Sequence, residues 1–254
     1  MRFILIILIL INILFANKNI TTITLATEDW APFSFKDPKT GQISGLSTQI
    51  IENTFKLMNV KIKDIKIYPW FRTQKMGYEG KFDAVYTASI NKERKQYMLF
   101  PKEPIITSKW VLFSTRNKQN KLRFDNLRSL KNKKFCLIGG YNYPKEFITY
   151  VLKNAKYSYV ATENLNLTKL LNGRCDYMPA VLETTLTKIK TNKKLRALSA
   201  YKKIFYFKKP LATTKFYLMF SKKRVDQTFV DKFSNTLKKF KTTKQYQKIV
   251  KHYL

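Results

Sequence analysis

Histidine, cysteine and acidic residues are all scarce in this chain of 254 residues. There is one histidine, His252, near the end of the sequence, and there are two cysteines, Cys136 and Cys175. One histidine argues against a Ser-His-Asp or Cys-His catalytic site and against a metal site with two histidine ligands. Two cysteines are too few for a disulfide-rich scaffold or a zinc site of four thiolates. We therefore expect no catalytic residue, no metal and no cofactor.

The shortage of acids leaves a large positive charge. The chain has 49 Lys and Arg residues against 16 Asp and Glu residues, a formal net charge of +33. The lysines are spread over the whole sequence, and no run of five or more basic residues occurs. This distribution favours lysine as the general solvating residue of exposed faces, so we expect no nucleic-acid partner. A polyanionic or membrane surface and a nucleic acid stay as alternative partners for such a charge.

The N-terminus has the pattern of a secretory signal. Arg2 precedes an apolar run over residues 3–15, which ends at the small residue Ala16. The run is shorter than the ~20 residues that a membrane-spanning helix needs. We expect a signal peptide over residues 1–16 with cleavage after Ala16, and a mature chain in the periplasm. An uncleaved anchor stays as the alternative, because Leu14 is large for its place two residues before the cleavage site.

The two cysteines would then meet an oxidising compartment. Disulfides form and persist in the periplasm. Two buried cysteines can equally serve as small hydrophobic residues. The sequence leaves both interpretations of Cys136 and Cys175 open.

The apolar content of 44% can fill the cores of two lobes of roughly 100 residues each. Strands are predicted over residues 21–26, 60–68, 82–87, 134–138, 157–161, 176–181 and 216–221. Helices are predicted between the strands of each of two successive groups, which indicates two α/β units with parallel sheets. An amphipathic helix is predicted after residue 225. Two such lobes imply a cleft between them, where small ligands bind.

Several short motifs, in order along the chain, resemble family 3 of the bacterial extracellular solute-binding proteins, the amino-acid-receptor type. They are Trp30–Phe33 (WAPF), Gly80–Ala84 (GKFDA), Ser89–Arg94 (SINKER) and Leu170–Asp176 (LLNGRCD). The resemblance implies the two-lobed periplasmic-binding-protein fold of the α/β class, with a two-strand hinge and a ligand cleft. It implies lobe 1 over residues 20–108 and 216–254, lobe 2 over 109–215, and a hinge near 106–109 and 212–215.

The same resemblance implies a function. We expect a non-catalytic, monomeric receptor that closes around a small polar or carboxylated solute and delivers it to the permease of a membrane ABC transporter. A sensory receptor for the same class of solute, acting on a membrane signalling partner, is the first alternative. A dehydratase-type enzyme on the same fold is the second.

The resemblance assigns the first site residues to one lobe. Arg94 matches the arginine that grips the ligand's α-carboxylate, a task that suits the planar fork of a guanidinium. Ser89 matches a residue that donates to the ligand, and Trp30 matches the aromatic residue that stacks on it. Trp70 and Arg72 form a Pro-Trp-x-Arg segment that is similar to a subgroup of the family, and we expect them to line the cleft.

The opposite wall is expected to be more apolar than in the amino-acid receptors. Tyr141 and Tyr143 follow a Gly-Gly pair at a strand-to-helix turn, where the family usually has small hydroxyl residues. The acid that would hold an α-ammonium group is replaced by Val181, and Glu183 is the nearest acid that could take its place. A buried amino group without a carboxylate is expensive. The sequence therefore leaves open whether the ligand is an amino acid.

Overall fold

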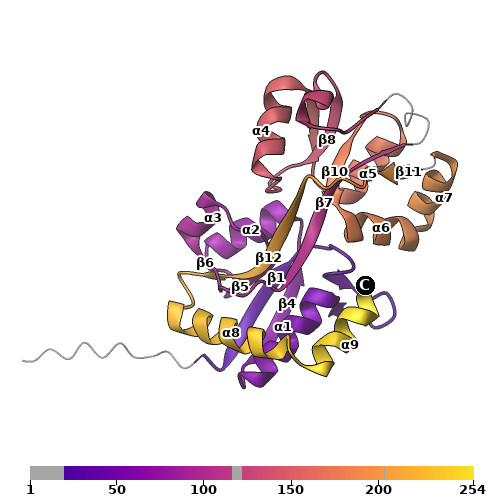
Figure 1. The fold of residues 1–254 in the computed structure, drawn as a ribbon. Helices are drawn as coiled ribbons and strands as arrows, with labels where there is room; N and C mark the ends of the chain where they lie inside the picture. The colour runs from indigo at the N-terminus through magenta and orange to yellow at the C-terminus, as the bar shows by residue number, and fades with distance from the viewer. Residues whose placement is uncertain (1–19, 116–121, 203) are drawn as a thin grey trace, which may run out of the picture.

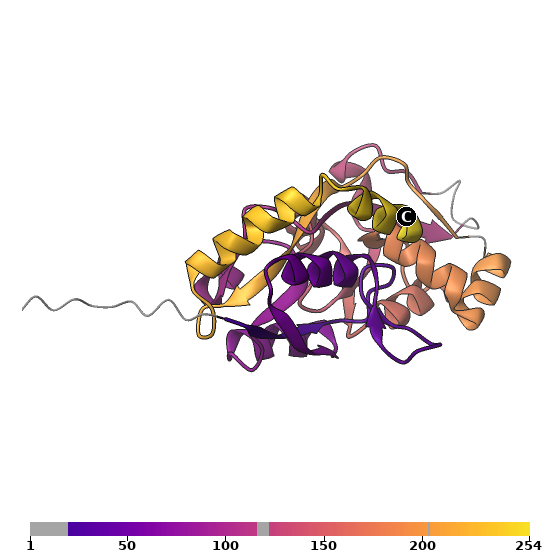
Figure 2. The same ribbon diagram turned by 90° about the horizontal axis from the view of Figure 1, so that it is seen from below.

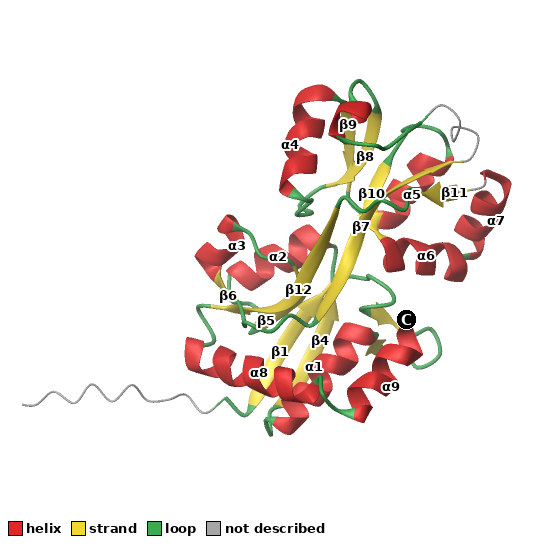
Figure 3. Cartoon of the chain, viewed as in Figure 1, coloured by secondary structure: helices red, strands yellow, loops and turns green. Residues whose placement is uncertain are grey.

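The computed structural model describes residues 20–115, 122–202 and 204–254, so the predicted signal segment lies outside the described residues. Two groups of helices and strands lie at opposite ends of two long strands, β7 (Ile106–Thr115) and β12 (Ala212–Ser221) (Figures 1 and 3). These strands pair antiparallel, from Ile106 opposite Phe216 to Trp110 opposite Ala212. They belong to a sheet of order β10-β7-β12-β5-β1-β4 that runs through both groups. The predicted two-lobed α/β architecture is confirmed.

The first lobe contains the N-terminal strands and the C-terminal helices. Its elements are β1 (Thr22–Thr27), β2 (Phe35–Lys36), β3 (Ile43–Ser44), α1 (Leu46–Leu57), β4 (Lys61–Ile67), α2 (Trp70–Tyr78), β5 (Ala84–Ala88), α3 (Lys92–Tyr97), β6 (Met98–Leu99), α8 (Gln227–Phe240) and α9 (Lys244–Tyr253). Strand β1 pairs parallel with β4 and β5, as the alternation of strands and helices predicts. Strand β12 pairs antiparallel with β5, because the chain re-enters this lobe from the other one.

The core of the first lobe lies between this sheet and three helices. Helix α1 packs against α8 and α9 (Figure 2). The apolar residues that predict α1 and the later helix are all buried: Leu46, Ile50, Ile51, Phe55, Met58, Val225, Phe229, Val230, Phe233, Leu237 and Phe240. Burying a large apolar side chain contributes about 1.5–3 kcal/mol, so this face fixes both helices.

The second lobe is built around a parallel pair of strands. Its elements are η2 (Leu127–Leu130), β8 (Lys134–Ile138), α4 (Lys145–Asn154), β9 (Lys156–Val160), α5 (Glu163–Leu171), β10 (Met178–Val181), α6 (Leu182–Thr191), α7 (Lys193–Lys202) and β11 (Ile204–Tyr206). Strands β8 and β9 are parallel, whereas β10 and β11 pair antiparallel with β7. The sequence did not predict α7 and β11, which have little apolar periodicity.

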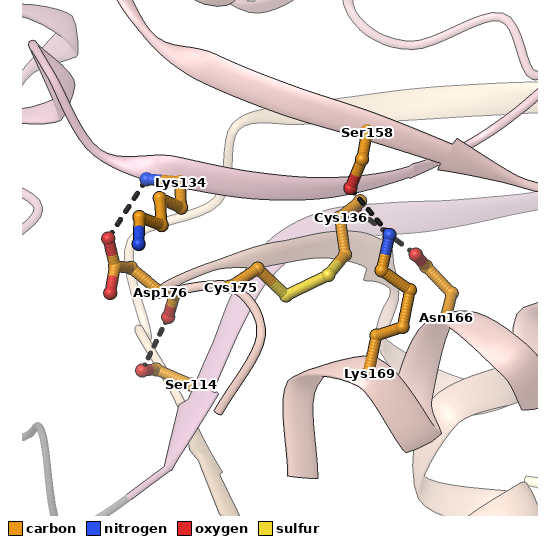
Figure 4. The surroundings of a disulfide bond; sticks show 8 residues. All are labelled: Ser114, Lys134, Cys136, Ser158, Asn166, Lys169, Cys175 and Asp176. Atoms are coloured by element: carbon orange, nitrogen blue, oxygen red, sulfur yellow. Dashed lines mark hydrogen bonds between the residues drawn. A yellow bond between two sulfur atoms is a disulfide. The ribbon is translucent and has the colours of Figure 1, made fainter. Parts of the chain in front are cut away.

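A disulfide joins Cys136 of β8 to Cys175, 39 residues further along (Figure 4). Both residues are buried in an apolar cluster of the second lobe. Next to it, Asp176 accepts a hydrogen bond from the backbone N–H of Lys134 at 2.9 Å, and its carbonyl accepts one from Ser114 at 2.8 Å. The sequence left open whether Cys136 and Cys175 form a disulfide or serve as buried small hydrophobic residues, and the structure has the disulfide.

In the described residues, no helix is both long enough and apolar enough to cross a membrane.

Candidate functional site

A cavity lies where the carboxyl ends of the strands of both lobes meet, which is the usual ligand position in α/β sheets. It is lined by Glu28, Trp30, Trp70, Thr87, Ser89, Arg94, Trp110, Tyr141, Asn142 and Phe216. The cavity measures about 20 Å³, which is room for a water-sized group. A solute as large as an amino acid can therefore enter only after the lobes separate.

Arg94 is held in place by four side-chain and backbone acceptors. It lies on the short helix α3, whose first turn is capped by the Asn91 side chain, which accepts from the Arg94 N–H at 2.7 Å. Its Nε donates to Gln74 at 3.0 Å, and Nη1 donates to the carbonyl and hydroxyl oxygens of Ser89 at 2.7 and 3.1 Å. Nη2 donates to the Gly140 carbonyl across the cleft at 3.4 Å. Arg94 is 2% exposed, so its guanidinium is a fixed cation rather than a free surface group.

Residues of the two lobes touch each other around this cation. The Arg94 guanidinium carbon lies over the Trp70 ring, 4.9 Å from the ring centroid. The Trp70 Nε1 donates to the Gly140 carbonyl at 3.1 Å. Asn142 donates to the Ser89 hydroxyl at 2.9 Å. These bonds hold the lobes together in a closed arrangement.

Trp30 lies both at the cavity and in the apolar core, and its stacking on a ligand stays a prediction. It lines the cavity, and its ring packs against Phe33 at 5.1 Å and Phe216 at 5.0 Å between centroids. The structure thus brings together the predicted residues Arg94, Trp30, Ser89, Trp70 and Tyr141 around one cavity.

The other predicted residues lie away from this cavity. The Tyr143 hydroxyl accepts from the Ile138 N–H at 2.7 Å, and its ring packs on Trp110. Arg72 is exposed and lies over the ring of Tyr68, 4.6 Å from its centroid. Glu183 accepts a hydrogen bond from Ser108 of β7. These three contacts give each side chain a structural role, and their roles in ligand binding stay predictions.

Two residues that the sequence did not single out have polar atoms with no partner in the described part of the chain. They are the Thr87 hydroxyl and the Trp110 Nε1, both buried and both in residues that line the cavity. Thr87 has a φ of 65°, a left-handed conformation that is costly for a β-branched residue by about 1–3 kcal/mol. Orphaned polar atoms and backbone strain are both typical of a binding site.

Glu28 is the third residue that the sequence did not identify. It follows β1 directly, and Tyr141 donates to its carboxyl group at 3.0 Å from the other lobe. Burial raises the pKa of Glu28 to about 8, although the hydrogen bond from Tyr141 lowers it. Its place at the carboxyl end of a parallel strand was the available signal. No group of three or more His, Cys, Asp or Glu residues in the described ranges is arranged to hold a metal ion.

A family model described as bacterial extracellular solute-binding proteins, family 3, matches residues 23–254. No curated protein matches the chain in sequence. Solved structures do match. The sensor domain of a histidine kinase with similarity to periplasmic binding proteins has a TM-score of 0.77 at 18% identity, covering 92% of this chain and 96% of that one. An ancestral amino-acid-binding protein, AncCDT-1, a precursor of cyclohexadienyl dehydratase, has a TM-score of 0.73 at 20% identity, covering 92% and 95%.

The substrate-binding protein AbpA of an amino acid ABC transporter from Streptococcus pneumoniae, bound to L-arginine, has a TM-score of 0.72 at 16% identity. The match covers 92% of this chain and 94% of that one. At these identities the likeness shows the fold. The predicted periplasmic-binding-protein fold is therefore confirmed.

Proposed function

We propose, from the premise that this chain belongs to family 3 of the bacterial extracellular solute-binding proteins, that it carries a small carboxylate-bearing solute to the permease of a membrane ABC transporter. The family binds solutes outside the cell, and the resemblance predicts delivery to a transporter. The geometry of this chain supports two features of that function, Arg94 as the anion-binding group and closure of the lobes about β7 and β12.

The observation that carries the proposal is the fixed guanidinium of Arg94 at a cavity between the lobes. A guanidinium has five N–H donors, and the longest of its contacts here is the 3.4 Å bond to the Gly140 carbonyl. A carboxylate placed at the Nη2 edge of the guanidinium, where the Gly140 carbonyl now lies, would receive charge-assisted hydrogen bonds in a site closed to water. The aromatic rings of Trp30 and Trp70 would form its apolar walls.

Closure would occur about the segment where the first halves of the two long strands pair. Thr107 lies opposite Lys215, and Lys109 lies opposite Thr213, so the predicted hinge segments 106–109 and 212–215 are hydrogen-bonded neighbours. We assign lobe 1 to residues 20–108 and 216–254, and lobe 2 to 109–215. Bending two adjacent strands moves one lobe against the other without breaking either core.

A sensory receptor is the second candidate, because the sensor domain of a histidine kinase has the same fold over nearly its whole length. The closed form would then act on a membrane signalling partner instead of a permease. We place the mature protein in the periplasm and assign it no reaction, although AncCDT-1 is the precursor of an enzyme.

A thermal-shift screen of amino acids, organic acids and amines tests the proposal. A solute that binds only the folded state raises the melting temperature by mass action. Calorimetric titration of the wild type and of Arg94→Lys follows, with Arg224→Lys as the matched control, since Arg224 forms an ion pair with Asp83 on the surface of lobe 1. If carboxylated solutes bind Arg94→Lys as tightly as the wild type, Arg94 is not the anion-binding group.

A further inference from the structure

The outer strand of the second lobe, β9, has one edge without a backbone partner. On its inner side β9 pairs parallel with β8, in one register and without a bulge. The other edge of β8 is already in use, since the Cys136 N–H donates to the Tyr177 carbonyl at 3.0 Å. Among the described residues, β9 is therefore an edge strand (Figure 3).

The bonds to β8 show which backbone groups of β9 point outward. The Lys156 N–H donates to the Lys133 carbonyl at 2.9 Å, and the Val160 carbonyl accepts from the residue after β8 at 3.0 Å. Alternate residues of a strand point their N–H and C=O groups to opposite sides. The groups of Tyr157 and Tyr159 therefore point away from β8, and in the described part of the chain no hydrogen bond reaches them.

The two faces of β9 differ in chemistry. Tyr157 and Tyr159 lie on one face with ring centroids 5.6 Å apart, and they are 45% and 51% exposed. Ser158 lies on the other face, where Lys169 of α5 donates to its hydroxyl (Figure 4). Lys156 shares the face of Ser158, because side chains alternate along a strand. The strand is thus aromatic on one face and basic on the other.

The chain around β9 is more basic than the chain as a whole. Residues 127–160 contain seven basic residues and one acid, Glu146. Lys156 lies directly opposite Lys134 in the register with β8, and like charges in that position destabilise a strand pair. Asp176 lies at the same end, where its carboxylate accepts from the Lys134 N–H. An anionic neighbour beside Lys156 would reduce this repulsion.

We propose that the outer edge of β9 is a docking site for an extended acidic segment of another protein, which adds to the sheet as a further strand. The segment's backbone would pair with the outward groups of Tyr157 and Tyr159, the usual source of affinity in strand addition. Its apolar side chains would lie on the tyrosine face, and its carboxylates would lie on the face of Lys156 and Lys169.

Charge selects this occupant over a second copy of the chain. Two chains that each carry a net charge of +33 repel each other. A lysine on an edge strand is also a common protection against self-pairing. Both effects attract an acidic strand, because the charge that repels a copy of the chain favours an anion.

Peptides of alternating sequence test the proposal by calorimetric titration at low ionic strength. A short capped Glu-Val peptide is the probe, and a Lys-Val peptide of the same length is the control for charge. We expect the Glu-Val peptide to bind about tenfold more tightly or better.

Amide hydrogen exchange on the same complex distinguishes strand pairing from simple charge attraction. Saturating Glu-Val peptide should slow exchange at the Tyr157 and Tyr159 amides by about tenfold or more. The Ser158 amide already points toward β8, so its rate should stay the same.

Two variants of one residue separate the backbone from the side chain. Tyr159→Pro removes an outward N–H and leaves the ladder to β8 intact, a position at which an edge strand tolerates proline. Tyr159→Thr removes the same ring and keeps the N–H. The Glu-Val peptide should bind Tyr159→Pro about tenfold more weakly than Tyr159→Thr. Lys156→Glu should also weaken binding, whereas Lys238→Glu, at an exposed position of α8, should not.

Equal binding of the two peptides, unchanged exchange at Tyr157 and Tyr159, or equal binding by the two Tyr159 variants would overturn the inference. A dimer in light scattering that Tyr159→Pro abolishes would place a second copy at this edge and would overturn it as well. The exchange measurement needs only the wild type, so it decides the case in which Tyr159→Pro fails to fold. The solute cavity takes no part in these experiments, so the proposed function is tested separately.

Discussion

Reduction of the Cys136–Cys175 disulfide should destabilise the protein by a predictable amount. The bond closes a loop of 39 residues, and the loop-closure entropy that it removes from the unfolded chain corresponds to about 4 kcal/mol at room temperature. Domains of this size are stable by about 5–15 kcal/mol, so the loss is a large fraction of the total. Both cysteines lie in the second lobe, which should therefore unfold first.

Equilibrium urea unfolding, followed by tryptophan fluorescence, measures the effect. The oxidised wild type is compared with the reduced wild type, which avoids the cavity that a smaller side chain would leave. The Cys136→Ala/Cys175→Ala double variant is the control, since reductant should not shift its midpoint. A midpoint that is the same for the oxidised and reduced wild type would refute the reasoning, as would free thiols in the native protein.

The remaining predictions concern the site and the N-terminus. Arg94→Ala should weaken binding of a carboxylated solute by roughly ten- to a hundredfold. It should also lower the melting temperature, because Gln74 and the Ser89 carbonyl lose a buried donor. Titration and melting curves equal to those of the wild type would contradict this prediction. Glu28 has an ordinary pKa near 4.5 when unfolded and about 8 when folded, so between these values the unfolded chain binds fewer protons. The free energy of unfolding should fall as pH rises through this window, by up to about 1.4 kcal/mol per pH unit, and Glu28→Gln should flatten the fall in a series of denaturation curves. The mature chain should be found in the periplasmic fraction with its N-terminus after Ala16; a chain that keeps Met1 in the membrane pellet would show an uncleaved anchor.

Much of the fold follows from the periodicity of apolar residues. The helical faces of α1 and α8 and the whole of β8 (Lys134–Ile138) could be predicted because each buries a regular set of side chains. Helix α7 could not, because it is held by its place next to α5 and α6 rather than by a strong apolar face of its own. The antiparallel entry of β12 depends on a crossover from the other lobe, which no local pattern encodes.

Some residues of the candidate site could also be predicted from the sequence, and others could not. Arg94, Ser89 and Trp30 could be predicted at the cavity because they belong to motifs of the family that the chain resembles. Trp70 could be predicted there because it belongs to the Pro-Trp-x-Arg segment. Trp110 reads as a core residue of an apolar strand, and Thr87 as an ordinary strand residue. Their unpartnered atoms and the φ of 65° at Thr87 exist only in three dimensions.

A second, larger cavity lined by Glu28, Glu163 and Lys188 was harder still to predict from the sequence. Glu28 and Glu163 are far apart in the chain and come from different lobes, and neither belongs to a motif. Their common environment depends on the arrangement of the two lobes, which places the end of β1 near the start of α5. A glutamate at a helix start is usually a solvated residue, so nothing local marks Glu163 as buried.

The Gly140 carbonyl has a consequence for how quickly a solute leaves. In the closed form this oxygen accepts from Trp70 and from Arg94, and Arg94 is the donor that we assign to an incoming carboxylate. When a solute binds, Arg94 therefore exchanges the Gly140 carbonyl for the solute's carboxylate. The net gain in binding free energy is the difference between these two hydrogen bonds rather than one whole bond. When the solute leaves, the Arg94 guanidinium can donate to the Gly140 carbonyl again and does not lose a hydrogen-bond partner. This lowers the barrier to dissociation. A carrier that must give up its cargo within each transport cycle benefits from such an internal substitute, because affinity among related complexes is mostly set by the rate of release.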